Sequence, residues 1–179
     1  MLELDDLVVL LMGAPSKVPA LQNRIEGITR LEKLVFLLER ESSFGNILTE
    51  DTEFKPYNFG PFSANVYKAV NYLSAYGLIE DSAKIADSRE DSWEQIRVID
   101  DGHADPYATR VFALTDLGVE YYAALMEGLD DSTRRIDELR KFKHQYAALP
   151  LRQLIRYVYN KYPDTTSNSL IRDEVLGNG

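Results

Sequence analysis

Cysteine is absent from this 179-residue chain, and histidine is scarce, with only His103 and His144. The lack of cysteine excludes disulfide bonds, thiolate zinc sites and a cysteine nucleophile. The two histidines have no spacing typical of metal ligands, and His103 lies in an acidic stretch, residues 100–105, that is typical of a solvated turn. We therefore expect no metal site and no cofactor.

Sequence motifs of catalysis are missing as well. The chain contains no glycine-rich phosphate loop and no nucleophile elbow, and no pattern indicates a pair of buried carboxylates. We therefore expect that the protein is not an enzyme.

Long hydrophobic runs are also absent. No apolar run reaches the roughly 18 to 20 residues that a membrane-spanning helix needs. The first apolar run follows Glu3, Asp5 and Asp6, whereas a signal peptide begins with a basic region. These features predict a cytoplasmic protein with no membrane partner.

Basic residues are outnumbered by acidic ones. The chain has 20 Lys and Arg against 29 Asp and Glu, a net charge of −9. Such a charge keeps a protein soluble and opposes non-specific attraction to phosphate backbones and anionic lipids, although it allows a local basic patch. DNA binding is therefore disfavoured but not excluded.

The most informative stretch is residues 54–80, FKPYNFGPFSANVYKAVNYLSAYGLIE. Gly60-Pro61 breaks the chain, and Ser63 stands where a helix N-cap is expected. Apolar residues then recur at helical spacing on one face: Val66, Ala69, Val70 and Leu73. Gly77 ends the predicted helix, and Leu78-Ile79 begins a strand. This order is typical of the centre of a winged helix-turn-helix.

Two helices are predicted before this stretch. The first is a buried helix over residues 2–12, followed by a connection over 14–27. The second begins after Thr29, with Glu32 at the capping-box spacing, and runs to about Glu41. Residues 42–53 are polar and predicted to be loop.

A wing is predicted after the central stretch. Residues 96–99 and 108–114 have the composition of two short strands that would pair as a hairpin. Thr115 then caps a helix from Asp116 to about Glu127, for which we expect four inward side chains: Leu117, Tyr121, Ala124 and Leu125.

Three further helices are predicted beyond a boundary at residues 128–131. They cover 132–148, with apolar spacing at 136, 139, 142 and 146, then 150–162, starting at Pro150, and 167–176. The predicted fold is α+β and mainly α. A winged helix-turn-helix core occupies residues 1–127, and a C-terminal helical extension over 128–179 packs on it or on a partner subunit.

Five short motifs carry a family resemblance. They are Lys33-Leu34-Val35-Phe36, Phe59-Gly60-Pro61-Phe62-Ser63, Val66-Tyr67, Gly77-Leu78-Ile79 and Leu114-Thr115-Asp116-Leu117-Gly118. In this order they resemble the YwgA-like small winged-helix proteins and, more distantly, the phage-associated proteins of the Panacea antitoxin group. The resemblance covers residues 1–127, and it implies a regulator or antitoxin whose partner is a toxin. The long acidic segment over 81–107 and the added C-terminal helices depart from the family pattern.

The leading hypothesis is a non-enzymatic regulatory or protein-interaction module. Tyrosine is common in interface cores, because it supplies contact area at low entropic cost. The predicted contact residues for another protein, or for a second copy in a homodimer, are Tyr57, Phe59, Phe62, Tyr157 and Tyr159. A core helix with a solvated hydroxyl is the alternative explanation for the C-terminal tyrosines.

The alternative function is a sequence-specific DNA-binding transcriptional regulator. A recognition helix over 63–77 would present Asn65 and Lys68 to the bases. Phosphate contacts would come from the most basic stretch of the chain: Arg134, Arg135, Arg140, Lys141 and Lys143. The same cations could instead pair with acids of their own chain. Nine acids between residues 80 and 105, against Lys84, Arg89 and Arg97, disfavour a wing that contacts phosphates. A third hypothesis is that the acidic surface mimics DNA.

Overall fold

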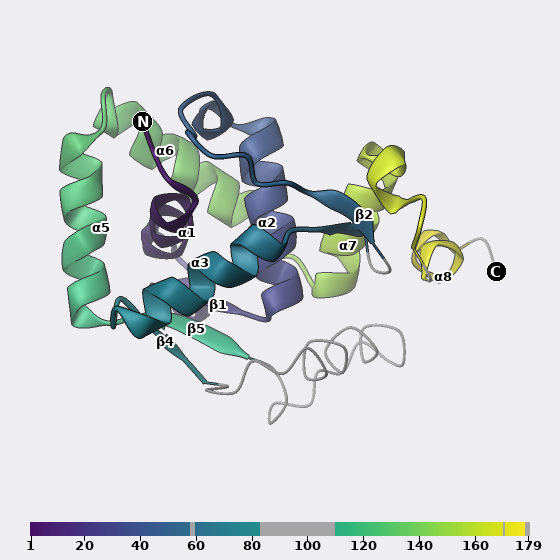
Figure 1. Cartoon of the computed structure of the whole chain (residues 1–179), viewed down its shortest axis with the longest axis horizontal. Coiled ribbons are helices and arrows are strands. Elements are labelled where there is room, and N and C mark those ends of the chain that lie inside the picture. Colours follow the sequence, from purple (N-terminus) through teal and green to yellow (C-terminus); the bar gives the residue numbers. More distant parts are fainter. Residues whose placement is uncertain (58–59, 83–109, 170, 178–179) are drawn as a thin grey trace.

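The computed structural model describes residues 1–57, 60–82, 110–169 and 171–177. Over these residues the chain is a mainly helical α+β fold with seven α-helices and two small antiparallel sheets (Figure 1). This confirms the predicted fold class at that level. Within the described part, no helix combines the length and the apolar character needed to cross a bilayer.

Helix α1 (Leu4–Gly13) forms the centre of the core. All side chains from Leu7 to Met12 are buried, because the helix is apolar on every side and must be covered all round. Helices α3 (Ala64–Ala75) and α5 (Asp116–Gly128) pack against it on two sides, and α2 (Ile28–Glu41) contacts it as well (Figure 1).

The larger sheet is formed by segments far apart in the sequence. Its strand order is β1 (Arg24–Glu26), β5 (Val111–Leu114) and β4 (Ile79–Asp81), all antiparallel. Buried Ile25 of β1 lies opposite buried Phe112 of β5.

Two predictions about this sheet need correction or stay open. The segment 14–27, predicted as a connection, contains the 3₁₀ turn η1 (Pro19–Leu21) and also strand β1, which was not predicted. The strand at 108–114 exists as β5, and its partners within the described residues are β1 and β4. The strand predicted at 96–99 lies outside the described residues.

Helix α2 begins two residues earlier than predicted. Gly27, with φ +90°, takes the capping position, and its N–H donates to the carbonyl of Arg110. Thr29 is therefore inside the first turn and buried, so its predicted capping role was wrong. The helix end at Glu41 was predicted correctly. The polar segment that follows contains one 3₁₀ turn, η2 (Ser43–Asn46).

Helix α3 (Ala64–Ala75) confirms the prediction for the central stretch. The Ser63 hydroxyl accepts a hydrogen bond from the Val66 N–H at 3.3 Å, and the predicted apolar stripe is buried. Gly77 has φ +73°, a left-handed conformation that favours glycine at the end of a helix.

Helix α5 (Asp116–Gly128) is capped by Thr115 as predicted, but three of its four predicted inward side chains are exposed: Leu117, Tyr121 and Ala124. Leu125 packs against the core as predicted, and Gly118 and Met126 are buried. The reason is the contact at Gly118: a Cβ there would lie 2.0 Å from the Leu78 carbonyl oxygen. Only a glycine allows this approach, and it turns the helix so that Leu117 faces solvent.

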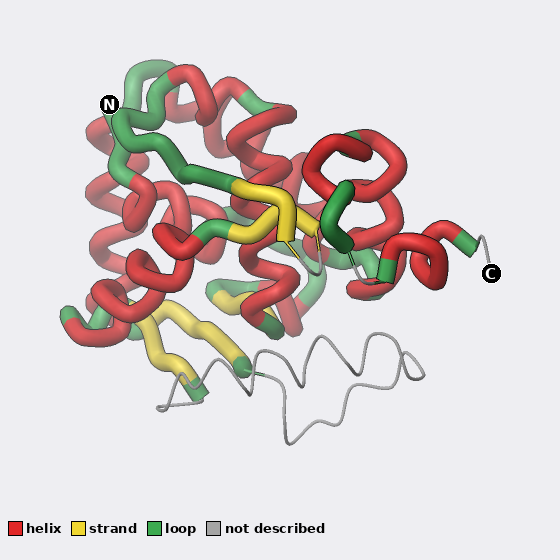
Figure 2. Tube along the Cα trace, turned by 45° about the vertical axis from the view of Figure 1, so that its right-hand side comes forward, coloured by secondary structure: helices red, strands yellow, loops and turns green. Residues whose placement is uncertain are grey.

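The C-terminal extension packs on its own core. It consists of α6 (Ser132–Phe142), the π-helical turn η3 (Lys143–Ala147), α7 (Leu151–Lys161), the 3₁₀ turn η4 (Pro163–Thr166) and α8 (Arg172–Leu176). Helix α7 contacts α2, and both α7 and η4 contact the hairpin of β2 (Lys55–Tyr57) and β3 (Gly60–Phe62), as Figure 2 shows. Leu154, Ile155 and Val158 of α7 are buried, and Leu151 is half-buried.

Candidate functional site

The Gly-Pro turn is fixed to helix α2 by two buried side chains. The Lys33 ammonium donates to the Pro61 carbonyl at 2.7 Å, and the Glu32 carboxylate accepts from the Ser63 N–H at 3.0 Å. Desolvation lowers the pKa of Lys33, although the neighbouring Glu32 opposes that shift. Lys33 of the first motif therefore contacts Pro61 of the second, and neighbouring Glu32 contacts Ser63, so the role of these contacts is structural.

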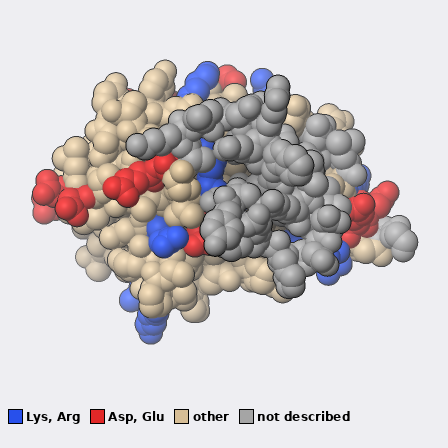
Figure 3. All heavy atoms as spheres, turned by 90° about the horizontal axis from the view of Figure 1, so that it is seen from below, with Lys and Arg blue, Asp and Glu red and all other residues tan. Residues whose placement is uncertain are grey.

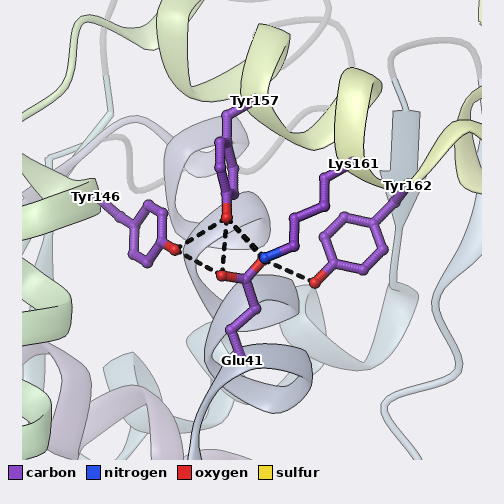
Figure 4. Close-up of polar contacts among 5 residues, drawn as sticks. All are labelled: Glu41, Tyr146, Tyr157, Lys161 and Tyr162. Carbon is purple, nitrogen blue, oxygen red and sulfur yellow. Dashed lines mark hydrogen bonds and ion pairs between the residues drawn. The ribbon is translucent and has the colours of Figure 1, made fainter.

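The carboxylate of Glu41, at the end of α2, is contacted by four hydrogen-bond donors from the C-terminal extension (Figure 4). The hydroxyls of Tyr146, Tyr157 and Tyr162 donate to its carboxylate at 2.5, 3.0 and 2.7 Å, and the Lys161 ammonium lies 2.9 Å away. Burial opposes ionisation of this carboxylate, but the hydrogen bonds prevail and lower its pKa. The cluster fastens η3 and α7 to α2.

The predicted protein-contact residues lie in different environments. Tyr159 is buried, and its hydroxyl is 2.8 Å from that of Ser169. Tyr157 is half-buried in the Glu41 cluster, and half-buried Phe62 packs between Tyr57 and Tyr67. Only Tyr57 is exposed, and Phe59 lies outside the described residues. The C-terminal tyrosines therefore serve intramolecular packing in this structure.

The predicted nucleic-acid contacts are not gathered into one basic face. Arg134 pairs with Asp131, while Arg140 and Lys141 both pair with Asp137. Lys143 is buried and donates to the carbonyls of Met12 at 2.6 Å and Ala14 at 3.0 Å. Arg135 is also buried, where its guanidinium donates to the Ser43 hydroxyl. Lys143 and Arg135 therefore cannot reach phosphates in this conformation, because both serve to hold α6 and η3 on the core.

Asn65 and Lys68 lie on the outer side of α3, as predicted, but in acidic surroundings. The Lys68 ammonium donates to Asn65, whose amide donates to the Asp51 carbonyl. Both residues line a groove of about 390 Å³ between α3, the start of α1 and the segment before β2. Its charged and aromatic lining consists of Glu3, Asp5, Glu50, Asp51, Lys68 and Tyr72.

Tyr72 of this groove is one of several exposed apolar side chains in this part of the molecule. Of the eight large apolar side chains exposed in the described part of the chain, five lie on α3, at its C-cap or on α5; Val119 is one of them, and the other four are Tyr72, Tyr76, Leu117 and Tyr121. The C-terminal end of α3 meets the start of α5, since the Thr115 hydroxyl donates to the Gly77 carbonyl just past α3 at 2.6 Å. Tyr121 also reaches α1, where its hydroxyl donates to Asp6 at 2.6 Å.

We call this surface the α3–α5 face. It comprises the four apolar residues above and the acids Glu3, Asp5, Asp6, Glu50 and Asp51. Burial raises the pKa of Asp5, and the nearby carboxylates of Glu50, Asp6 and Glu3 raise it further. The hydrogen bond to Asp6 and partial burial raise the pKa of Tyr121 to about 12. Repulsion by neighbouring carboxylates contributes to both shifts, after burial at Asp5 and after the hydrogen bond and burial at Tyr121.

Most of this face was not predicted from the sequence. Leu117 and Tyr121 were expected to face the core, and the N-terminal acids were considered only as evidence about targeting. Tyr72 and Tyr76, four residues apart on the side of α3 opposite the predicted apolar stripe, were the available signal. The acids could not be placed beside them, because α1 and the 50–51 segment are distant in sequence.

A second groove, of about 300 Å³, runs along α6 and is lined by both signs of charge, including Glu41, Arg134, Asp137 and Lys141. Its cations are already paired, Lys141 with Asp137 and Arg134 with Asp131, as described above. No cluster of three or more potential metal ligands occurs among the described residues. Searches with the sequence and structure found no matching family model, curated protein or solved structure.

Proposed function

We propose that this protein is a non-enzymatic regulatory module that acts by binding another protein. The observation that carries the proposal is the acidic groove along α3. A DNA-reading helix needs cations on its outer side and beside it, to contact base edges and phosphates. Here the outer side of α3 offers Lys68 against the carboxylates of Glu3, Asp5 and Glu50.

A winged-helix arrangement is part of the proposal. The order α1, β1, α2, α3, β4, β5, with the three strands in one antiparallel sheet, favours it. In that arrangement α3 has the place of the recognition helix. A winged helix whose α3 is surrounded by acids is suited to a protein partner, because like charges repel a phosphate backbone.

The pairing of exposed cations also supports this function. Figure 3 shows the underside of the molecule, where acidic side chains lie at the end occupied by α5 in Figure 1 and also at the opposite end, and basic ones are scattered between them. The exposed cations of α6 are paired with Asp131 and Asp137, so the alternative, a DNA-binding regulator, would have to break these pairs to contact phosphates.

The test is a native affinity purification of the tagged full chain, with protein and nucleic acid both analysed in the eluate. A stoichiometric protein partner, retained at moderate salt and depleted in the Tyr72→Ser/Tyr76→Ser double variant, is the expected result. The control is Tyr57→Ser, which removes an exposed tyrosine from the β2–β3 hairpin. Enrichment of DNA with a defined motif, and of no protein, would overturn the proposal and establish the DNA-binding alternative.

A further inference from the structure

We infer that the α3–α5 face binds a basic protein segment that carries apolar anchor residues, such as an amphipathic helix rich in Lys and Arg. This inference rests on the proposed function and names the chemistry of its partner. Three features of the described residues carry it: the exposed aromatic and aliphatic side chains, the groove beside them, and the sign of the charge around both.

The apolar part of the face is suited to anchoring. Tyr72 and Tyr76 are 55% and 71% exposed, and Leu117 on the adjacent helix is 53% exposed. Single exposed apolar residues are common on protein surfaces, but a group on two adjacent helices is typical of an interaction site. Tyrosine in particular contributes strongly to binding, since it buries a large area with few rotatable bonds.

The charge of the face selects the partner. Four acids, Glu3, Asp5, Glu50 and Asp51, line the groove together with one cation, Lys68, and Asp6 lies next to Asp5 at the start of α1. Asp5 is only partly exposed, and its raised pKa has the neighbouring carboxylates among its causes. A Lys or Arg side chain in the groove would relieve that repulsion, and could also lie over the Tyr72 ring as a cation–π contact.

The same charge argues against other occupants. A second copy of this chain would bring an identical acidic surface against the first, and like charges across an interface are unfavourable. Nucleic acid and anionic membranes are repelled for the same reason. A basic segment alone offers both charge complementarity and apolar contacts.

The experiment uses two synthetic helical peptides with the same leucine positions, at i, i+3, i+4 and i+7. One has Lys and Arg at the flanking positions, and its twin has Glu and Asp. Binding of each labelled peptide to the full chain is measured by fluorescence anisotropy at low and high salt. We expect the basic peptide to bind, its affinity to fall as salt rises, and the acidic twin not to bind.

Two pairs of variants locate the site. Tyr72→Ser/Tyr76→Ser should weaken binding of the basic peptide by about tenfold or more, because anchoring aromatic residues carry much of the affinity. Asp5→Lys/Glu50→Lys should also weaken it, by about tenfold. The matched control is Asp164→Lys/Asp173→Lys, which makes the same change in net charge on the exposed C-terminal segment and should leave affinity within about twofold of the wild type. Thermal unfolding followed by circular dichroism verifies that each variant folds.

The outcomes separate this inference from the proposed function. Equal binding of both peptides, or equal weakening by the matched control, would overturn the inference, because attraction would then be non-specific. A native partner whose capture is unaffected by the Asp5→Lys/Glu50→Lys variant would overturn it too, while leaving the proposed function in place. Recovery of DNA alone would overturn the proposed function itself.

Discussion

The contact between Gly60 and Tyr159 makes it possible to test whether the C-terminal extension belongs to the same folding unit as the core. Gly60 has φ +89°, and a Cβ built on it would lie 2.7 Å from Cε1 of Tyr159. The Tyr159 ring is buried and its hydroxyl is hydrogen-bonded to that of Ser169, so the ring cannot move away without losing this bond and its packing. The Gly60→Ala substitution should therefore strain the backbone and push α7 off the hairpin.

The matched control is Gly77→Ala. Gly77 has φ +73° but no atom within 4 Å of a built Cβ, so alanine there meets only the backbone strain. That strain costs about 1 to 2 kcal/mol for a residue other than glycine, and overpacking a core costs about 1 to 3 kcal/mol. The reduced freedom of the unfolded chain affects both variants equally. Gly60→Ala should thus be less stable than Gly77→Ala by about 1 to 3 kcal/mol.

The assay is urea unfolding followed by circular dichroism, with the melting temperature as a second readout. For a chain of this size, the difference corresponds to a melting temperature lower by about 2 to 12 °C. In a Tyr159→Ala background, Gly60→Ala and Gly77→Ala should lower the free energy of unfolding equally, because the ring that the Gly60→Ala methyl group would clash with is gone. Equal costs in the wild-type background, or a difference that persists without Tyr159, would refute the packing of α7 on this turn.

Three further predictions concern charges that are buried or half-buried. Glu41→Gln should lower the free energy of unfolding at neutral pH by about 1 to 3 kcal/mol. The folded-state pKa of Glu41 lies below its ordinary value of 4.5, so the wild type should lose this advantage as the pH falls below 4.5. Acid titration of the stability of both proteins checks this. Desolvation lowers the pKa of Lys143 to about 8 from 10.5, so between these pH values the unfolded chain binds more protons than the folded one. The free energy of unfolding should therefore rise with pH in this range, by at most about 1.4 kcal/mol per pH unit. This dependence on pH should be weaker in Lys143→Met, and an unchanged dependence would show that it does not come from Lys143. Arg110→Met should lower stability because it removes the 2.6 Å ion pair of the buried Asp81 carboxylate, and Arg110→Met/Asp81→Leu should recover part of that loss in urea unfolding.

Local patterns in the sequence determined most of the secondary structure. The Ser63 and Thr115 caps, the apolar stripes of α3 and α7, and the turn at Gly77 all depend on neighbours within a few residues. Such interactions are encoded by spacing along the chain, which is why the mainly α architecture could be predicted. The errors at Thr29, at β1 and on the inward face of α5 have another origin. Each is decided by a partner distant in sequence: the carbonyl of Arg110 for Gly27, strand β5 for β1, and the Leu78 carbonyl for Gly118.

The candidate site shows the same division. The sequence by itself determined the net negative charge, the lack of cysteine and the aromatic residues on the outer side of α3. Only the tertiary structure decided which charged side chains are accessible to a binding partner. It buried Lys143 against α1 and turned Leu117 outward, whereas the pairs of Arg134 with Asp131 and of Arg140 with Asp137 follow from i,i+3 spacing that the sequence already contains. It also brought the N-terminal acids beside α3. Charge and burial depend on what the folded chain places nearby, and spacing along one helix does not contain that information.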